Sequence, residues 1–141
     1  MPTSWDAATA VLEAYQVRLD RALQDGAKSY EAALKDPPPN VGVHEIDLEM
    51  RILRVNPEEL KLFGYTEQQM LGKKATDFIV MQETAQRAIE QKVTGAKELK
   101  AFMRTFKRAD GSAVPMILLD RHMKDKNGRV LGLRTVMTPA T

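Results

Sequence analysis

The chain of 141 residues has 21 Lys or Arg and 19 Asp or Glu, and its net charge of +2 gives no electrostatic signature of a nucleic-acid-binding protein. It has no cysteine, which excludes disulfides, thiolate metal sites and thiol nucleophiles. The sequence is 43% hydrophobic but has no apolar run of about 20 residues, so we expect a cytoplasmic globular protein without a membrane segment or a nucleic-acid partner.

Residues 1–36 are predicted to form a helical extension. Apolar residues recur there at spacings of three and four, as in the seam of a coiled coil, at Trp5, Ala8, Leu12, Tyr15 and Leu19. Gly26 interrupts the pattern, which indicates either one kinked helix or two helices. The seam could pack on the rest of its own chain, form a homodimer contact with a second chain, or do some of both. Residues 37–40 follow as a proline-rich spacer.

After this spacer the apolar pattern changes from helical to alternating. It predicts strands over 41–47 and 52–55, a short connection over 75–79, a helix over 82–94, and strands over 98–108, 112–124 and 129–138. Short connections of this kind join antiparallel neighbours. The predicted fold is therefore α+β, with one five-stranded antiparallel sheet within residues 41–138, short helices on one face, and a tail of residues 139–141.

Two very short helices are predicted between the second strand and residue 72. Asn56 is a suitable N-cap for the first, and Glu59 can complete a capping box with it. Gly64 can end that helix in the left-handed conformation. Thr66 and Gln69 repeat the capping box for the second helix. Helices this short are marginal in water, so they must pack on another element.

The strand predicted over 112–124 is apolar on both faces where it begins. Met116 and Leu118 lie on one face, and Ile117 and Leu119 lie on the other. A sheet with two apolar faces is covered on both sides. We expect the run of short helices to cover one face and the amino-terminal helix to cover the other.

Three segments resemble the signature regions of the PAS domain, the sensory module of signalling proteins. They are 47–56, 63–73 and 106–116, and they occur in the family's order and at similar spacing. The resemblance covers residues 41–138 and is closest to PAS domains of bacterial two-component sensor kinases, including oxygen-sensing ones. It implies a PAS fold and a regulatory role in signal transduction.

The sequence also departs from the family pattern at two places. Met50 stands where many members have a turn glycine, and residues 136–138 replace a terminal Asp-aliphatic-Thr triplet. That triplet couples many members to an output helix. The chain is therefore either a free-standing PAS protein with a separate signalling partner or a fragment cut before its output domain.

The resemblance implies a ligand pocket between the sheet and the helical run. The residues expected to line it are Phe78, Ile89, Val93, Met103, Met116, Leu118, Asp120, His122 and Leu133. We expect Asp120 and His122 near its mouth. There they either mark the point where the strand leaves the core or hold a polar group of a ligand.

The residue types present disfavour three cofactors known in this family. Flavin adducts and coumaryl-type chromophores need a cysteine, and the usual haem site needs a histidine on the helix over 82–94, which has none. A non-covalent flavin or a haem held by another strand stays open, and the ligand is unknown. We expect structural or surface roles for His44 and His122 and no metal site.

Three functional hypotheses follow. The first is a sensory PAS module that works through conformational change driven by a small ligand or a protein partner. The second is a ligand-free dimerisation or docking scaffold whose pocket is filled by its own side chains. The third is an enzyme of unknown type, which is the least favoured because the sequence has no catalytic motif.

Overall fold

A computed structural model describes residues 4–95 and 98–140 of the chain. The helices are α1 (Trp5–Asp25), α2 (Ala27–Leu34), α3 (Pro57–Phe63), α4 (Glu67–Met70), the 3-10 helix η1 (Ala75–Phe78) and α5 (Gln82–Val93). The strands are β1 (Gly42–Asp47), β2 (Ile52–Val55), β3 (Phe102–Lys107), β4 (Ala113–Lys124) and β5 (Val130–Pro139). No helix in the described ranges is long and apolar enough to cross a membrane.

The strands form one antiparallel sheet in the order β2-β1-β5-β4-β3. The two predicted strand groups therefore meet where β1 pairs with β5. The α+β architecture and the five strands are confirmed, but β3 begins at Phe102 and not at residue 98. Its ladder with β4 ends at the pair of Phe102 and Leu118, and Glu98 and Lys100 before it are exposed.

The amino-terminal extension is two helices, not one kinked helix. Ser4 accepts a hydrogen bond from the backbone N–H of Ala7 and caps α1. Gly26 separates the helices with a φ of 130°, a conformation that L residues with a side chain rarely adopt. The Tyr15 hydroxyl then donates to the Ala33 carbonyl at 2.6 Å, which ties α1 to α2.

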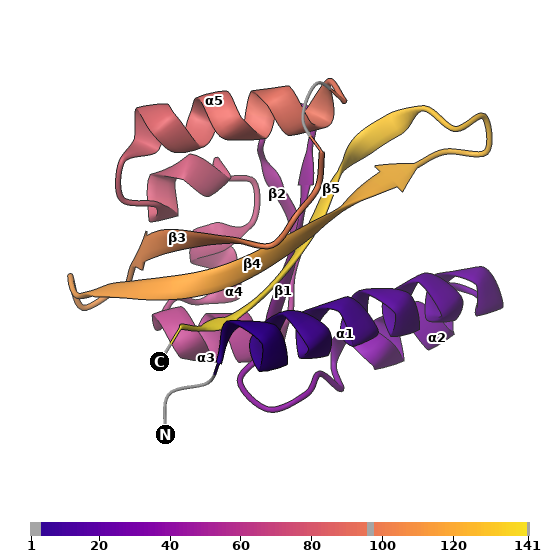
Figure 1. The fold of residues 1–141 in the computed structure, drawn as a ribbon, viewed down its shortest axis with the longest axis horizontal. Coiled ribbons are helices and arrows are strands. Elements are labelled where there is room, and N and C mark those ends of the chain that lie inside the picture. Colours follow the sequence, from indigo (N-terminus) through magenta and orange to yellow (C-terminus); the bar gives the residue numbers. More distant parts are fainter. Residues whose placement is uncertain (1–3, 96–97, 141) are drawn as a thin grey trace.

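Two apolar clusters lie on opposite faces of the sheet. The larger one lies between the sheet and the run from α3 to α5 and includes Met116 and Leu118, and the other lies beneath α1 and α2 and includes Ile117. Figure 1 shows α5 on one side of the sheet and α1 with α2 along the other. The prediction that the sheet is covered on both faces is therefore confirmed, because alternate residues of β4 point into different clusters.

The predicted seam of α1 packs on its own chain. Ala8, Leu12, Tyr15 and Leu19 are buried in the cluster beneath α1, whereas Trp5 remains 43% exposed. Four of the five residues proposed for a dimer contact thus already have partners within the chain. A dimer formed through this helix would need a different face of α1.

A polar contact anchors α1 in addition to this apolar packing. Gln16 is fully buried and donates to the carbonyls of Leu119 and Arg134 at 2.9 and 3.0 Å. The Arg134 guanidinium donates to Gln16 Oε1 at 2.7 Å and to Asp20 Oδ1 at 2.5 Å. Because Arg134 is itself buried, these bonds fix the position of α1 along β4 and β5.

In the turn between β1 and β2, a methionine has the positive φ for which glycine is the usual residue. Met50 adopts a φ of 65°, which is unfavourable for a residue with a side chain. Its side chain is buried in the cluster between the sheet and α5. Burial of the side chain therefore offsets the strained backbone.

Candidate ligand-binding site

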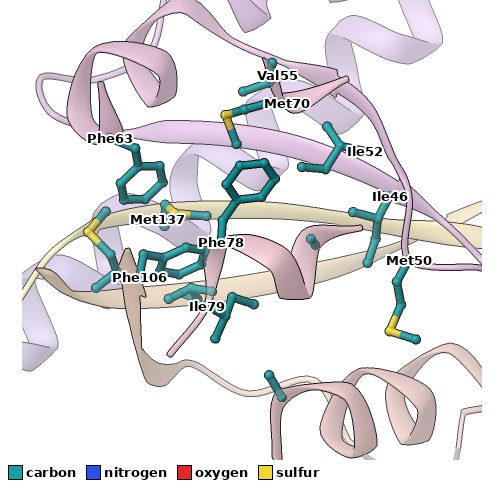
Figure 2. Packing of buried hydrophobic residues seen from close by; sticks show 14 of the residues in the cluster. Ile46, Met50, Ile52, Val55, Phe63, Met70, Phe78, Ile79, Phe106 and Met137 are labelled. Carbon is teal, nitrogen blue, oxygen red and sulfur yellow. The ribbon is translucent and has the colours of Figure 1, made fainter. Parts of the chain in front are cut away.

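Most of the predicted pocket residues lie together in the layer between the sheet and α5. Five belong to its buried apolar cluster: Phe78, Ile89, Met116, Leu118 and Leu133. Val93 packs against the same cluster. Figure 2 shows Phe78 within this layer, near Phe106 and Met137. The resemblance implied these residues, and the alternation of β4 is consistent with it, because alternate side chains of a strand share one face of the sheet.

Met103 does not enter this layer. It pairs with Ile117 of β4, and paired residues of an antiparallel sheet share a face, so it points to the side of α1. It is 56% exposed. As a residue of an edge strand it still borders a groove that opens beside α5, described below.

Asp120 is buried between the sheet and α5. One carboxylate oxygen accepts a hydrogen bond from Lys92 Nζ at 2.8 Å, and the other accepts one from the Thr135 hydroxyl at 2.5 Å. Lys92 projects from α5 and is also buried. Asp120 is the last buried residue of β4, as expected for the point where the strand leaves the core, and it is also half of a buried ion pair that joins α5 to the sheet.

His122 lies one pleat further along the same face and is half-buried. Its Nε2 lies 2.8 Å from the backbone carbonyl of Lys92, in the last turn of α5. A protonated Nε2 donates to that carbonyl, which satisfies one of the free acceptors at the end of the helix. His122 thus has the hydrogen-bonded structural role expected for it, and it orients the segment that carries Lys92.

A second buried polar pair lies on β1. The His44 Nδ1 lies 2.8 Å from Glu59 Oε2, and both side chains are buried. Burial alone would lower the pKa of His44, but the charge of Glu59 and its hydrogen bond outweigh this and raise that pKa above its usual 6.5. Gly42 makes room for the pair, since a Cβ there would lie 2.8 Å from Glu59 Cβ.

This pair replaces part of the predicted capping box. Asn56 does cap α3, with its side-chain oxygen accepting from the Glu59 N–H at 3.0 Å. The Glu59 side chain, however, pairs with His44 instead of returning to the Asn56 backbone, whose N–H donates to Val43. A capping pattern is a local signal, whereas the partner that the Glu59 carboxylate binds, His44, is 15 residues away in the sequence. The second capping box, between Thr66 and Gln69, is present as predicted.

The polar residues of the layer form one row across the sheet. His44 pairs with Thr135, and Thr135 pairs with Asp120, so all three side chains project toward α5. The row brings a histidine–carboxylate pair and a lysine–carboxylate pair into one otherwise apolar layer. Few polar groups placed in an apolar setting are typical of small-molecule sites.

A groove of about 330 Å³ opens between the first half of α5 and β3. It is lined by Val80, Met81, Thr84, Ala85, Ala88, Met103, Arg104 and Thr105. Arg104 is half-buried and lies on the face of β3 that points toward α5. Its guanidinium carbon lies 4.7 Å from the centre of the Phe102 ring, and Lys92 Nζ lies 3.3 Å from the same ring centre.

A family model described as PAS domain matches residues 40–138 of the chain. The chain belongs to the PAS domain family. Members of that family are sensory and signalling modules, so the resemblance seen in the sequence is confirmed. No curated protein matches the chain significantly.

Solved PAS domains share the fold of this PAS domain at low sequence identity. A PAS domain from Colwellia psychrerythraea has 15% identity and a TM-score of 0.68, covering 79% of this chain and 94% of that one. A PAS domain of an HTR-like protein from Haloarcula marismortui has 20% identity and a TM-score of 0.61, with 86% and 96% covered. The PAS domain of a LuxR-family transcriptional regulator from Burkholderia thailandensis, solved in complex with ethanol, has 17% identity and a TM-score of 0.61, with 78% and 96% covered.

The interior of this PAS domain does not fit a large flat cofactor. The rings of Phe63 and Phe106 stack with their centres 4.9 Å apart, and the rings of Tyr65 and Phe78 meet edge to face at 4.9 Å. Figure 2 shows Phe63, Phe78 and Phe106 filling the space between the helices and the sheet. A flavin or haem ring would have to displace these side chains. Within the described ranges, no cluster of three or more His, Cys, Asp or Glu side chains could hold a metal ion.

Sequence reasoning missed four polar residues of this PAS domain: Glu59, Lys92, Arg104 and Thr135. One signal could have revealed Lys92, which lies three and seven positions after Ile89 and Ala85 and so shares their buried face of α5. Arg104 alternates with Phe102 and Phe106 on β3 in the same way. A charged residue in an apolar register is a sign of a buried partner or a site.

Proposed function

We propose that this PAS domain is a sensory module in which a small molecule bound beside α5 changes how α1 packs on the sheet. The single observation that carries the proposal is a pair of consecutive residues on β5. Thr135 points toward α5 and donates to Asp120, whereas Arg134 points the other way and donates to Gln16 and Asp20 of α1. A shift of β5 would therefore disturb hydrogen bonds on both faces of the sheet.

The neighbouring strand repeats the arrangement. Asp120 of β4 pairs with Lys92 of α5, and the next residue, Arg121, has its Nε 3.4 Å from Asp20 Oδ2 of α1. β4 thus has polar contacts with both helices, whereas β5 contacts α1 directly and α5 through Asp120 of β4. The contacts of Asp120 with Lys92 and Thr135 are buried, and buried polar contacts have strict geometry, so they respond to displacements that apolar packing tolerates.

The energetics suit a switch. Removing one partner of a buried ion pair costs about 3–5 kcal/mol, so a ligand that reorders Lys92 and Asp120 acts on contacts of large free energy. A ligand shifts the equilibrium only by the difference between its affinities for the two states. Ethanol bound to the PAS domain of the Burkholderia regulator supports small molecules as a class of ligand for this one. The proposal gives the chain a binding role, not a catalytic one, in a cytoplasmic signalling pathway of the two-component type.

Hydrogen exchange tests the coupling without knowledge of the ligand. Thr135→Val removes one hydroxyl in the layer beneath α5 and changes neither size nor charge appreciably. If the two faces are coupled, the amides of α1 should exchange about threefold to tenfold faster, the equivalent of one lost hydrogen bond. The measurement is mass-spectrometric hydrogen exchange on the full chain, with Lys92→Met as a stronger perturbation of the same layer.

The matched control is Thr94→Val, which removes an exposed hydroxyl beyond the end of α5. It should leave exchange in α1 unchanged. Faster exchange spread equally over α1, β1 and β3 would indicate a general loss of stability, and the coupling proposal would then be rejected. So would unchanged exchange in α1 for both test variants.

A second candidate function is a homodimeric docking scaffold, which the outer face of α1 favours. Small residues recur there at spacings of three and four, at Ala7, Ala10, Ala14 and Val17, and all are exposed. Small residues allow two helices to approach closely. The two functions are compatible, since a dimer through α1 would carry the change in its packing to a second subunit or a signalling partner.

A further inference from the structure

We propose that the groove between α5 and β3 binds a small monocarboxylate with a short apolar body, and that Arg104 pairs with its carboxylate. This inference rests on the proposed sensory function and assigns the chemical class of its ligand.

Arg104 is a cation without an acceptor in the part of the chain that the structure describes. No described residue gives its guanidinium an ion pair or a hydrogen bond, and its contact is with the face of the Phe102 ring. Partial burial lowers the pKa of Arg104, against the opposing charge of Asp120. A guanidinium still remains charged in proteins, so Arg104 is a half-buried cation that contacts no acceptor among the described residues.

The acidic group that acts on Arg104, Asp120, already has a partner of its own. Lys92 forms an ion pair with Asp120, and a protonated His44 forms one with Glu59. Among the described residues that line the groove, Arg104 is the one that carries a charge, and that charge is positive. A ligand with one negative charge would balance it, whereas the second negative charge of a dianion such as a phosphate ester would have no cation in the lining of the groove and would increase the repulsion from the Asp120 carboxylate.

The size and lining of the groove indicate the size and polarity of the uncharged part of the ligand. Its volume of about 330 Å³ lies at the small end of the range for ligand pockets. Ala85 and Ala88 have small side chains that leave space beside α5, and Val80 adds an apolar surface. Met81 and Met103 border it with flexible side chains that can adapt to a short chain or ring. The hydroxyls of Thr84 and Thr105 add polar groups to the same wall.

A carboxylate matches the donor that the groove offers. The planar guanidinium presents paired N–H groups with the spacing of two carboxylate oxygens, and such bonds are stronger than neutral ones. Binding there would place the ligand against β3 and α5, next to the ring that Lys92 also contacts. The ligand would thus act on the Lys92–Asp120 pair through Phe102.

Isothermal titration calorimetry of the full chain tests the proposal with three probes that share one alkyl chain: hexanoate, hexanamide and hexanol. Hexanoate should bind at least about tenfold more tightly than the other two, since a hydrogen bond to a charged group contributes about 1.5–3 kcal/mol. Arg104→Gln should abolish this preference, and Arg104→Lys should keep part of it. Circular dichroism checks that both variants are folded.

The matched control is Arg87→Gln, which removes an exposed arginine from α5 itself. It should bind hexanoate as the parent chain does. Equal binding of hexanoate and hexanamide, an unchanged preference in Arg104→Gln, or no binding of hexanoate at millimolar concentration would each overturn the proposal. If hexanoate binds but exchange in α1 does not respond to Thr135→Val, the ligand class is supported and the coupling between the two faces is rejected. If exchange responds but hexanoate does not bind, the coupling is supported and the ligand class is rejected.

Discussion

At the scale of single residues, this PAS domain is defined by charges in an apolar layer. Lys92 with Asp120 and His44 with Glu59 are both fully buried pairs with contacts of 2.8 Å. A buried pair is weak evidence for stability, because desolvation opposes the attraction between the charges. It does make the layer sensitive to any change in protonation or in partner.

Folding stability should depend on pH through His44. Its pKa is raised in the folded chain, so its contribution is fully present below about 6.5 and is lost as pH rises through the folded pKa. The free energy of unfolding should therefore fall as pH increases above neutrality. Glu59, Asp120 and Arg104 are the charged groups that act on His44.

Urea unfolding between pH 6 and pH 9, about the working range of common buffers, measures this dependence. His44→Gln should remove the slope, whereas His122→Gln should retain it. A slope that persists in His44→Gln would assign the pH dependence to another group.

At the scale of elements, the chain uses positive φ angles in two contrasting ways. Met50 in the β1–β2 turn and Met81 before α5 have nearly the same φ, 65° and 62°. The Met50 side chain is buried, whereas that of Met81 is 72% exposed. The backbone strain at Met50 is therefore offset by burial of its side chain, whereas the exposed side chain of Met81 offsets little of the strain there.

Glycine should consequently have opposite effects at these two positions. Met50→Gly relieves about 1–2 kcal/mol of backbone strain but loses about 2–5 kcal/mol of packing, so it should destabilise the fold by up to about 4 kcal/mol. Met81→Gly relieves the same strain and loses little packing, so it should be neutral or stabilise by up to about 1 kcal/mol. Thermal or chemical unfolding measures both, and a stabilising Met50→Gly would show that its side chain contributes little.

At the scale of the whole molecule, α1 and α2 complete the core. They cover an apolar face of the sheet that includes Val43, Ile117 and Val136. Deleting residues before Pro37 would expose that face, so aggregation of the shortened chain would say nothing about a dimer. The outer stripe of α1 is a better place to test association.

A chain carrying Ala10→Glu and Val17→Glu should remain folded but should be monomeric if the outer stripe of α1 forms a dimer. Both positions are exposed, so stability should change by less than about 0.5 kcal/mol. Multi-angle light scattering gives the mass in solution. Leu131→Glu, at a position 49% exposed on β5, is the matched control and should leave the mass unchanged. An unaltered dimer in the double variant would exclude this face of α1.

The sequence by itself determined the elements and the fold, because these follow from local signals. Thr66 with Gln69 and the glycine at position 64 fixed the short helices, and the alternation of β4 placed Met116 and Leu118 in the layer that faces α5. Such signals act over a few residues and can be read one segment at a time.

Only the tertiary structure decided how the polar residues are used. Glu59 lies in a capping pattern but pairs with His44, 15 residues away in the sequence. Asp120 lies near the end of the apolar part of its strand and pairs with Lys92, 28 residues away. The α1 seam likewise found its partner in the sheet of the same chain. A charge in a sequence shows no partner, and burial makes its pairing depend on which strands and helices the fold brings together.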